Sequence, residues 1–110
     1  MKKAYKHAKR LMGVYKIRIS RNDNKIFIGF ATDLPGRFNR HKAELKFGSH
    51  RNRELQEIWN SFGEESFEFE ILDVLDHGEE PHATPDEELH VLQEMWVQKL
   101  EKEGNFIVYL

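Results

Sequence analysis

The residues that decide the fold run from 13 to 41 and read GVYKIRISRNDNKIFIGFATDLPGRFNRH. Over residues 14–20 apolar and basic side chains alternate, which is the period-two pattern of a half-buried strand. Turn-forming residues follow at 21–24, and an apolar run that favours β-structure resumes over 25–31. This stretch therefore predicts an antiparallel hairpin that leads directly into a helix.

The helix after this hairpin has a defined start and a defined end. Asp33 can accept hydrogen bonds from the free amides of the first turn, where Pro35 is tolerated because its missing N–H costs little there. One helical stripe and a glycine stop follow, at Leu34, Phe38, His41, Leu45 and Gly48.

The rest of the chain predicts a second helix over about 52–62, a third strand over 67–75, a polar loop over 76–83 and a last helix that ends near Gly104. The last helix opens with a capping box, TPDE at 84–87. The apolar tail at 105–110 either adds an edge strand or docks on the core. The order strand, strand, helix, helix, strand, helix indicates a small α/β sandwich: a three-stranded antiparallel sheet flanked by helices.

Length and composition favour one globular domain. A chain of 110 residues can bury one core, and we expect a basic N-terminal arm at 1–12 followed by a single domain at 13–110. With no cysteine, a disulfide framework, a thiolate nucleophile and a Cys-ligated zinc site are excluded. No apolar run is long enough to span a membrane, and the first ten residues lack the apolar centre of a signal peptide, so we expect a cytoplasmic protein.

The charge is distributed unevenly along the chain. The formal net charge is −2, but residues 1–53 carry 15 basic and 3 acidic residues, and residues 54–110 carry 2 basic and 16 acidic ones. A basic half can present a phosphate-binding face even in a nearly neutral chain, because affinity for a polyanion follows the local field. Alternatively, the two halves pack together and neutralise each other.

Three side chains of the opening stretch, with one histidine beyond it, suggest phosphate chemistry. Hydrolysis of a phosphodiester without a cysteine or a serine triad needs an activated water, positive charge near the phosphate and usually a divalent cation. Tyr15 can orient or deprotonate a water if positive charge lowers its pKa. Arg37 and His41 stand four residues apart, so they share a helical face and can hold a phosphate together. His50 follows in a short turn.

Each of these residues also has a purely structural interpretation. A single tyrosine in a strand is usually structural, and His41 lies on the apolar stripe of its helix, where a hydrogen-bonded core histidine is the default. Arg37 alone is compatible with a surface cation. The nearby cations form either a nucleic-acid-binding surface or a solvated face: Arg40, Lys42, Lys46, Arg51 and Arg53.

Taken together, the motifs resemble the GIY-YIG nuclease superfamily. The paired tripeptides GVY at 13–15 and FIG at 27–29 would be a weak signal by themselves, but GRFNRH at 36–41, GSH at 48–50 and LQEIWNSFG at 55–63 make it specific. With Trp96 included, the likeness covers about residues 13–100, and the predicted order of elements agrees with that fold.

The resemblance implies a function and roles for individual residues. Members of the superfamily are typically DNA endonucleases or nuclease modules that use Mg²⁺ or Mn²⁺, with the metal bound by one glutamate on the last helix. Tyr15 would contact the attacking water and Arg37 would stabilise charge that builds on the phosphate. His41 and His50 would orient the water or contact the phosphate.

Two positions depart from the family pattern. Phe27 stands where the family has its second tyrosine, so one hydroxyl is absent. Gln93 stands where the family has its metal-binding glutamate, and a neutral amide is a poor anchor for a strongly hydrated cation. Glu94 is adjacent but turned about 100° around the helix. Asn105 is only loosely placed to match the family's late asparagine.

Three hypotheses follow. The first is a metal-dependent DNA nuclease whose activity is weakened by Phe27 and Gln93. The second is an inactive module of the same fold that binds DNA, or RNA, through its basic half. The third is a protein-interaction domain in which the acidic half matters more.

Overall fold

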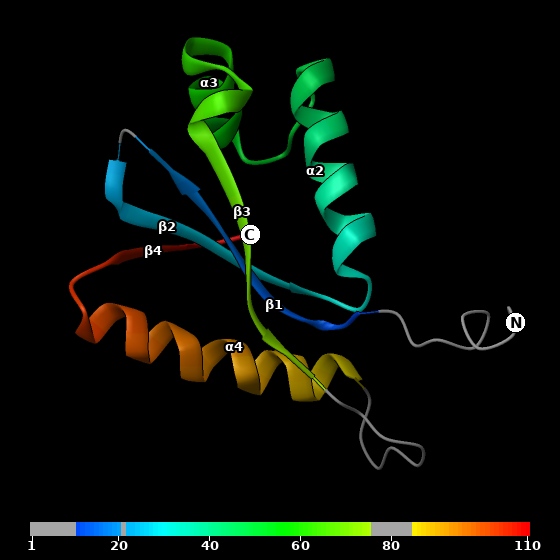
Figure 1. Ribbon diagram of the computed structural model, residues 1–110, viewed down its shortest axis with the longest axis vertical. Helices are drawn as coiled ribbons and strands as arrows, with labels where there is room; N and C mark the ends of the chain where they lie inside the picture. The colour runs from blue at the N-terminus through cyan, green and yellow to red at the C-terminus, as the bar shows by residue number, and fades with distance from the viewer. Residues whose placement is uncertain (1–10, 21, 76–84) are drawn as a thin grey trace, which may run out of the picture.

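A computed structural model gives the fold and describes residues 11–20, 22–75 and 85–110 (Figure 1). The predicted loop over 76–83 and nearly all of the predicted basic arm lie outside these residues, and so does Thr84 of the capping box. The elements are β1 (Gly13–Ile19), β2 (Asn22–Ala31), α2 (Leu34–Phe47), α3 (Arg53–Phe62), the 3₁₀ helix η1 (Glu64–Ser66), β3 (Phe67–Val74), α4 (Pro85–Lys102) and β4 (Phe106–Tyr109). The predicted α/β class and the predicted order of strands and helices are confirmed.

The sheet has four strands in the order β3-β1-β2-β4, one more than the predicted three. β1 pairs antiparallel with β2, as the hairpin pattern predicts, and it also pairs antiparallel with β3. The apolar tail forms β4, which pairs parallel with β2, so the sheet is mixed. Sequence periodicity left two possibilities for the tail, and pairing with the open edge of β2 satisfies its backbone donors and acceptors.

Helices cover both faces of the sheet (Figure 1). Helices α2 and α3 lie on one face, where their apolar side chains pack with Tyr15, Ile17 and Phe27 of the sheet. Helix α4 lies on the other face, against Val14 and Ile28 among others. Alternate residues of β1 and β2 thus enter different cores, which places Tyr15 and Gln93 on opposite sides of the sheet.

The ends of the helices follow the residues expected from the sequence. The Asp33 side chain accepts a hydrogen bond from the Gly36 amide at 3.2 Å, and α2 ends at Gly48 in the left-handed conformation. Asn52 caps α3 by accepting from the Leu55 amide at 2.9 Å, and Gly63 follows the last turn. These caps fix the short segment between α2 and α3, which carries His50.

Part of the basic half is neutralised by the acidic half. Lys16 and Arg18 of β1 pair with Glu70 and Glu68, the residues directly opposite them on β3. Lys25 pairs with a glutamate of α3. Within the described residues, no ion pair joins Arg37 or Arg51 to an acidic side chain. The neutralisation is therefore local, and it leaves positive charge at the start of α2 and before α3.

None of the helices within the described residues has both the length and the apolar composition needed to cross a bilayer.

Candidate active site

A cavity of about 430 Å³ opens beside the N-terminal half of α2. It is lined by Tyr15, Arg37, Arg40, His41, Glu44, His50, Arg51, Asn52, Tyr109 and Leu110. The structure thus brings together all four residues predicted to be catalytic and two of the five predicted to bind nucleic acid. Lys42, Lys46 and Arg53 do not line the cavity: the Lys42 ammonium lies 5.2 Å from the centroid of the Phe69 ring, and the other two side chains are exposed.

Tyr15 enters the site because a glycine lies opposite it. Tyr15 is fully buried in the middle of β1, and its Cα partner on β2 is Gly29. A Cβ placed at position 29 would lie 2.7 Å from the Tyr15 hydroxyl oxygen, far closer than carbon and oxygen can approach. The second tripeptide therefore ends in glycine so that the tyrosine ring can lie across the neighbouring strand.

Helix α2 supplies the polar wall of the cavity. Arg37, His41 and Glu44 follow one another at helical spacing and share a face. Arg40 hydrogen-bonds the carboxylate of Glu44 at 3.2 Å, one turn further on. The pattern of residue spacing was sufficient to place Glu44 beside His41, but a glutamate in a basic segment gave no chemical signal, and sequence reasoning missed it.

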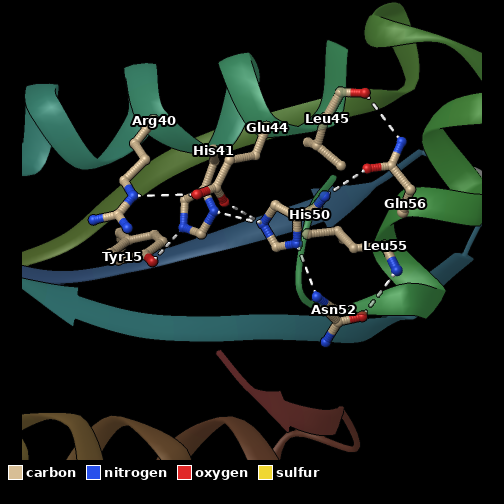
Figure 2. Close-up of polar contacts among 9 residues, drawn as sticks. All are labelled: Tyr15, Arg40, His41, Glu44, Leu45, His50, Asn52, Leu55 and Gln56. Atoms are coloured by element: carbon tan, nitrogen blue, oxygen red, sulfur yellow. Dashed lines mark hydrogen bonds and ion pairs between the residues drawn. The ribbon is translucent and has the colours of Figure 1, made fainter. Parts of the chain in front are cut away.

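The backbone around His50 is held by a glutamine that sequence reasoning also missed. Gln56, 8% exposed, accepts from the His50 amide at 3.0 Å through Oε1 (Figure 2). Its Nε2 donates to the Leu45 carbonyl at the end of α2 and to the Asn60 side chain, both at 3.0 Å. One side chain thus ties α2, the connecting segment and α3 together, and this fixes where His50 lies.

A continuous chain of hydrogen bonds crosses the site (Figure 2). The Tyr15 hydroxyl lies 2.6 Å from Nε2 of His41, and Nδ1 of His41 lies 2.8 Å from Nε2 of His50. The backbone N–H of Asn52 donates to Nδ1 of His50 at 3.0 Å. The two imidazole rings lie nearly parallel, with centroids 5.0 Å apart.

Burial keeps this chain uncharged near neutral pH. It lowers the pKa of His41 to about 4, with smaller contributions from His50 and from the positive charge of Arg37. It also lowers the pKa of His50, against an opposing effect of Glu44. Burial raises the pKa of Tyr15, and the positive charge of Arg37 offsets this only in part. Positive charge thus acts in the direction that the sequence suggested, but desolvation is the larger effect, so the condition under which Tyr15 would deprotonate a water is not met.

Comparison with known proteins identifies the family. A model of the GIY-YIG catalytic domain matches residues 11–95. The chain belongs to the GIY-YIG family. The match covers the hairpin, α2, α3, β3 and most of α4, so the whole cavity except its β4 end lies within it.

The relatives of this GIY-YIG domain are endonucleases by name. Intron-associated endonuclease 1 of Enterobacteria phage T4 is 36% identical over 63 residues, which are 57% of this chain and 25% of that protein. The aligned part is thus about a quarter of that relative's length. A mutant of the catalytic domain of intron endonuclease I-TevI superposes with a TM-score of 0.66 at 28% identity, covering 87% of this chain and 91% of that one. A second structure of the I-TevI catalytic domain gives 0.64, also at 28% identity, covering 88% and 97%.

The two departures from the family pattern lie in different cores. Phe27 is fully buried beneath α2 and α3, where it packs with the apolar residues around Tyr15 and leaves no hydroxyl at that position. Gln93 is 5% exposed on α4, and it is not among the residues that line the cavity. Asn105 hydrogen-bonds the Leu100 carbonyl at 3.0 Å, so its side chain serves the end of α4.

The family implies a divalent cation, and the family position does not fit one here. Gln93 offers a neutral amide oxygen in place of a carboxylate. Among the described residues that line the cavity, Glu44 is the one acidic side chain, and it already accepts a hydrogen bond from Arg40. Mg²⁺ and Mn²⁺ need charged oxygen ligands to replace tightly held water, so this cavity is a poor site for either ion.

A second possible ligand set also fails. Ligand atoms of His41, Glu44 and His50 lie within 4.8 Å of one another. However, Nδ1 of His50 accepts the Asn52 N–H, so the single proton of the neutral ring lies on Nε2, the atom that would have to bind the metal. The described residues that line the cavity therefore do not fit a resident metal ion.

Proposed function

We propose that this GIY-YIG domain binds the phosphodiester backbone of DNA in the cavity and cleaves it slowly. The observation that carries the proposal is the contact between Tyr15 and His41, 2.6 Å apart, in a cavity whose walls include Arg37, Arg40 and Arg51. The endonuclease names of the relatives and the 28% identity to the I-TevI catalytic domain support the same class of reaction.

The arginines supply what a phosphate diester needs for binding. Guanidinium groups form paired hydrogen bonds with phosphate oxygens and keep their charge at any working pH. Arg37 approaches from the first turn of α2 and Arg51 from the segment before α3, so a phosphate between them is held from two sides. Lys46 and Arg53 are exposed further along α2 and on α3, where they are available to neighbouring phosphates.

The same residues can assist cleavage. Attack of water on phosphorus forms one P–O bond and breaks the bond to one ester oxygen; the water releases its proton to solvent, and the leaving oxygen takes one up from solvent. The negative charge on the phosphoryl oxygens increases during this step, and a fixed cation beside those oxygens binds them more strongly in the transition state than in the ground state. In the proposal, Arg37 is this fixed cation beside the phosphoryl oxygens. Tyr15, whose hydroxyl is positioned by His41, holds a water or a phosphate oxygen by a hydrogen bond at the cavity floor.

The proposed cleavage is slow because one contribution is missing. In GIY-YIG nucleases a divalent cation supplies Lewis-acid stabilisation when bound. Without a carboxylate at position 93, or another fitting ligand set among the described residues, the protein's own cations carry the stabilisation alone.

A second candidate function is DNA or RNA binding without hydrolysis. The replacement of a hydroxyl by Phe27 and of a carboxylate by Gln93 favours it, because both changes remove catalytic groups and leave the arginines in place. Under this alternative the cavity binds a backbone phosphate, and the protein does not hydrolyse the nucleic acid.

Nicking of supercoiled plasmid tests the proposal. The native chain is incubated with plasmid in Mg²⁺, in Mn²⁺ and in EDTA beside Arg37→Ala, with Lys42→Ala as the matched control because Lys42 does not line the cavity. We expect slow nicking that Arg37→Ala abolishes and Lys42→Ala retains. Equal nicking by native chain and Arg37→Ala would refute the proposal. Binding without nicking would establish the second candidate, and single-stranded RNA as competitor separates DNA from RNA.

A further inference from the structure

The hydrogen-bond chain of the site has a single possible direction, and that direction originates at Asn52. A backbone N–H can donate but not accept. Because it lies 3.0 Å from Nδ1 of His50, that nitrogen must present its lone pair. The position of this amide is fixed, since Asn52 caps α3 through Leu55 and its carbonyl accepts from the Gln56 amide at 3.0 Å.

The proton positions of both histidines follow from this one contact. A neutral imidazole carries one proton, so His50 carries it on Nε2. That N–H points at Nδ1 of His41, 2.8 Å away, which must then accept. His41 therefore carries its own proton on Nε2, where it faces the Tyr15 oxygen at 2.6 Å. Once the protonated nitrogen of His50 is assigned, only one tautomer of His41 remains possible.

Donors therefore face Tyr15. His41 donates to its oxygen at 2.6 Å, and the guanidinium of Arg37, which has donors only, lines the same cavity. The hydroxyl proton must point away from both, toward the cavity that the ring borders. Among the described residues, the Tyr15 hydroxyl has no hydrogen-bond partner besides the ring of His41, so the oxygen that accepts this proton belongs to a group bound in the cavity that Tyr15 lines.

We infer that the backbone amide of Asn52, acting through His50 and His41, makes Tyr15 a hydrogen-bond donor to a bound phosphate or water oxygen, and prevents it from taking up a proton there. To receive a proton from the cavity, Tyr15 would have to pass its own to His41. The direction of every hydrogen bond in the series would then reverse, and an N–H at Nδ1 of His50 would point at the N–H of Asn52. Tyr15 therefore binds and orients, and Asn52 and His50 are positioning residues.

The inference rests on the proposed function only for the identity of the bound oxygen. The tautomers are a property of the free protein and can be measured without any substrate. Failure of DNA binding would refute the proposed function and leave the tautomer assignment standing, whereas a wrong tautomer would refute this inference alone.

Nitrogen-15 NMR of the histidine rings tests it directly. In the uniformly labelled full chain near pH 7, we expect His41 and His50 each to show a protonated Nε2 and an unprotonated Nδ1, with resonances assigned from His41→Gln and His50→Gln. A proton on Nδ1 of either ring, or a charged ring, would overturn the inference.

Two variants of the same residue isolate the amide. Asn52→Pro and Asn52→Ala both lose the capping side chain, but only proline lacks the N–H, and the φ of −83° at this position is close to the range of proline. We expect Asn52→Ala to keep the native tautomers and Asn52→Pro to show a mixture at His50. A single native tautomer in Asn52→Pro would contradict the role of the amide. Should that variant not fold, the tautomers of the native chain decide the question.

The donor role has its own readout. Tyr15→Phe keeps the ring and removes the donated proton, so affinity for duplex DNA in EDTA should fall about tenfold, the effect of one hydrogen bond to a charged acceptor. Unchanged affinity would show that the Tyr15 proton is not given to the bound phosphate.

Discussion

Gly29 lies directly opposite Tyr15 in the β1–β2 register, and the tyrosine hydroxyl occupies the space that any side chain at position 29 would need. This relationship explains why the two tripeptides of the hairpin act as a unit. The first tripeptide provides the hydroxyl. The second ends in a residue without a side chain, and this leaves the space in which the hydroxyl reaches His41.

Gly29→Ala should therefore destabilise the fold and displace Tyr15. We expect the free energy of unfolding to fall by about 1–3 kcal/mol, because the added methyl overpacks a buried contact. Urea unfolding measures it, with Thr32→Ala, exposed just beyond the same strand, as the control. A native-like midpoint for Gly29→Ala would mean that the tyrosine moves aside at no cost.

Stability should fall as the pH falls, because of His41. The unfolded chain takes up this proton near the ordinary histidine pKa of about 6.5, and the folded chain only near pH 4. Between these values the unfolded state binds more protons than the folded state. The free energy of unfolding therefore decreases as the pH is lowered, by about 2 kcal/mol from pH 7 to pH 5. The loss should be fully developed below the folded-state value.

Urea unfolding across this pH range checks the contribution of His41. His41→Gln should be less stable at pH 7 and should show a flatter pH dependence, while His90→Gln, at an exposed position on α4, should follow the native curve. Parallel curves for native chain and His41→Gln would contradict the assignment of this pH dependence to His41.

DNA affinity should depend on salt in a way that distinguishes the cavity cations from other cations. Removal of one cation that touches a phosphate reduces the slope of log K against log salt by about 0.9, so Arg51→Ala should lower both affinity and slope. Lys42→Ala should change neither, because its ammonium lies over the Phe69 ring. Fluorescence anisotropy with a short duplex provides the measurement, and equal effects of the two variants would argue against a phosphate held in the cavity.

Restoring the family carboxylate should cost stability when no metal is present. Gln93 is nearly fully buried, so Gln93→Glu places a carboxylate in a poorly solvated position, at a cost of about 1–3 kcal/mol in EDTA. We expect Mn²⁺ to recover part of this loss, since an ion that binds only the folded state stabilises it by mass action. Thermal unfolding with and without Mn²⁺ measures both effects.

The control for this variant is Gln98→Glu, at an exposed position of the same helix, which should respond to neither condition. A loss of stability in Gln93→Glu that Mn²⁺ does not reverse would mean that a carboxylate at position 93 cannot share an ion with the cavity on the other face of the sheet.

The sequence predicted the local elements because their signals are local. Alternation at 14–20, the Asp33 cap and the Gly48 stop each depend on neighbours within a few residues, and each was found where it was predicted. The four residues predicted to be catalytic also met in one cavity, because the family resemblance carries tertiary information that periodicity does not.

Other features depended on contacts between distant residues. The Gln56 side chain acts on His50 and Leu45 only after two helices pack, and the parallel pairing of β4 with β2 needs the finished sheet. The direction of the pKa shift of Tyr15 likewise required its burial, which composition and spacing do not give. Nothing in the local pattern distinguishes these residues from ordinary polar or apolar ones.

The cavity joins residues from the two ends of the described chain: Tyr15 forms part of its floor, and Leu110, whose amide donates to the Ile28 carbonyl at 2.8 Å, forms part of its rim. The two residues are far apart in the sequence, so the cavity is complete only when the C-terminal strand has paired with β2. A partly folded chain can thus contain the hairpin and α2 and still have no complete cavity. Any activity of this site therefore comes from the fully folded state, and a partly folded chain is expected to show none.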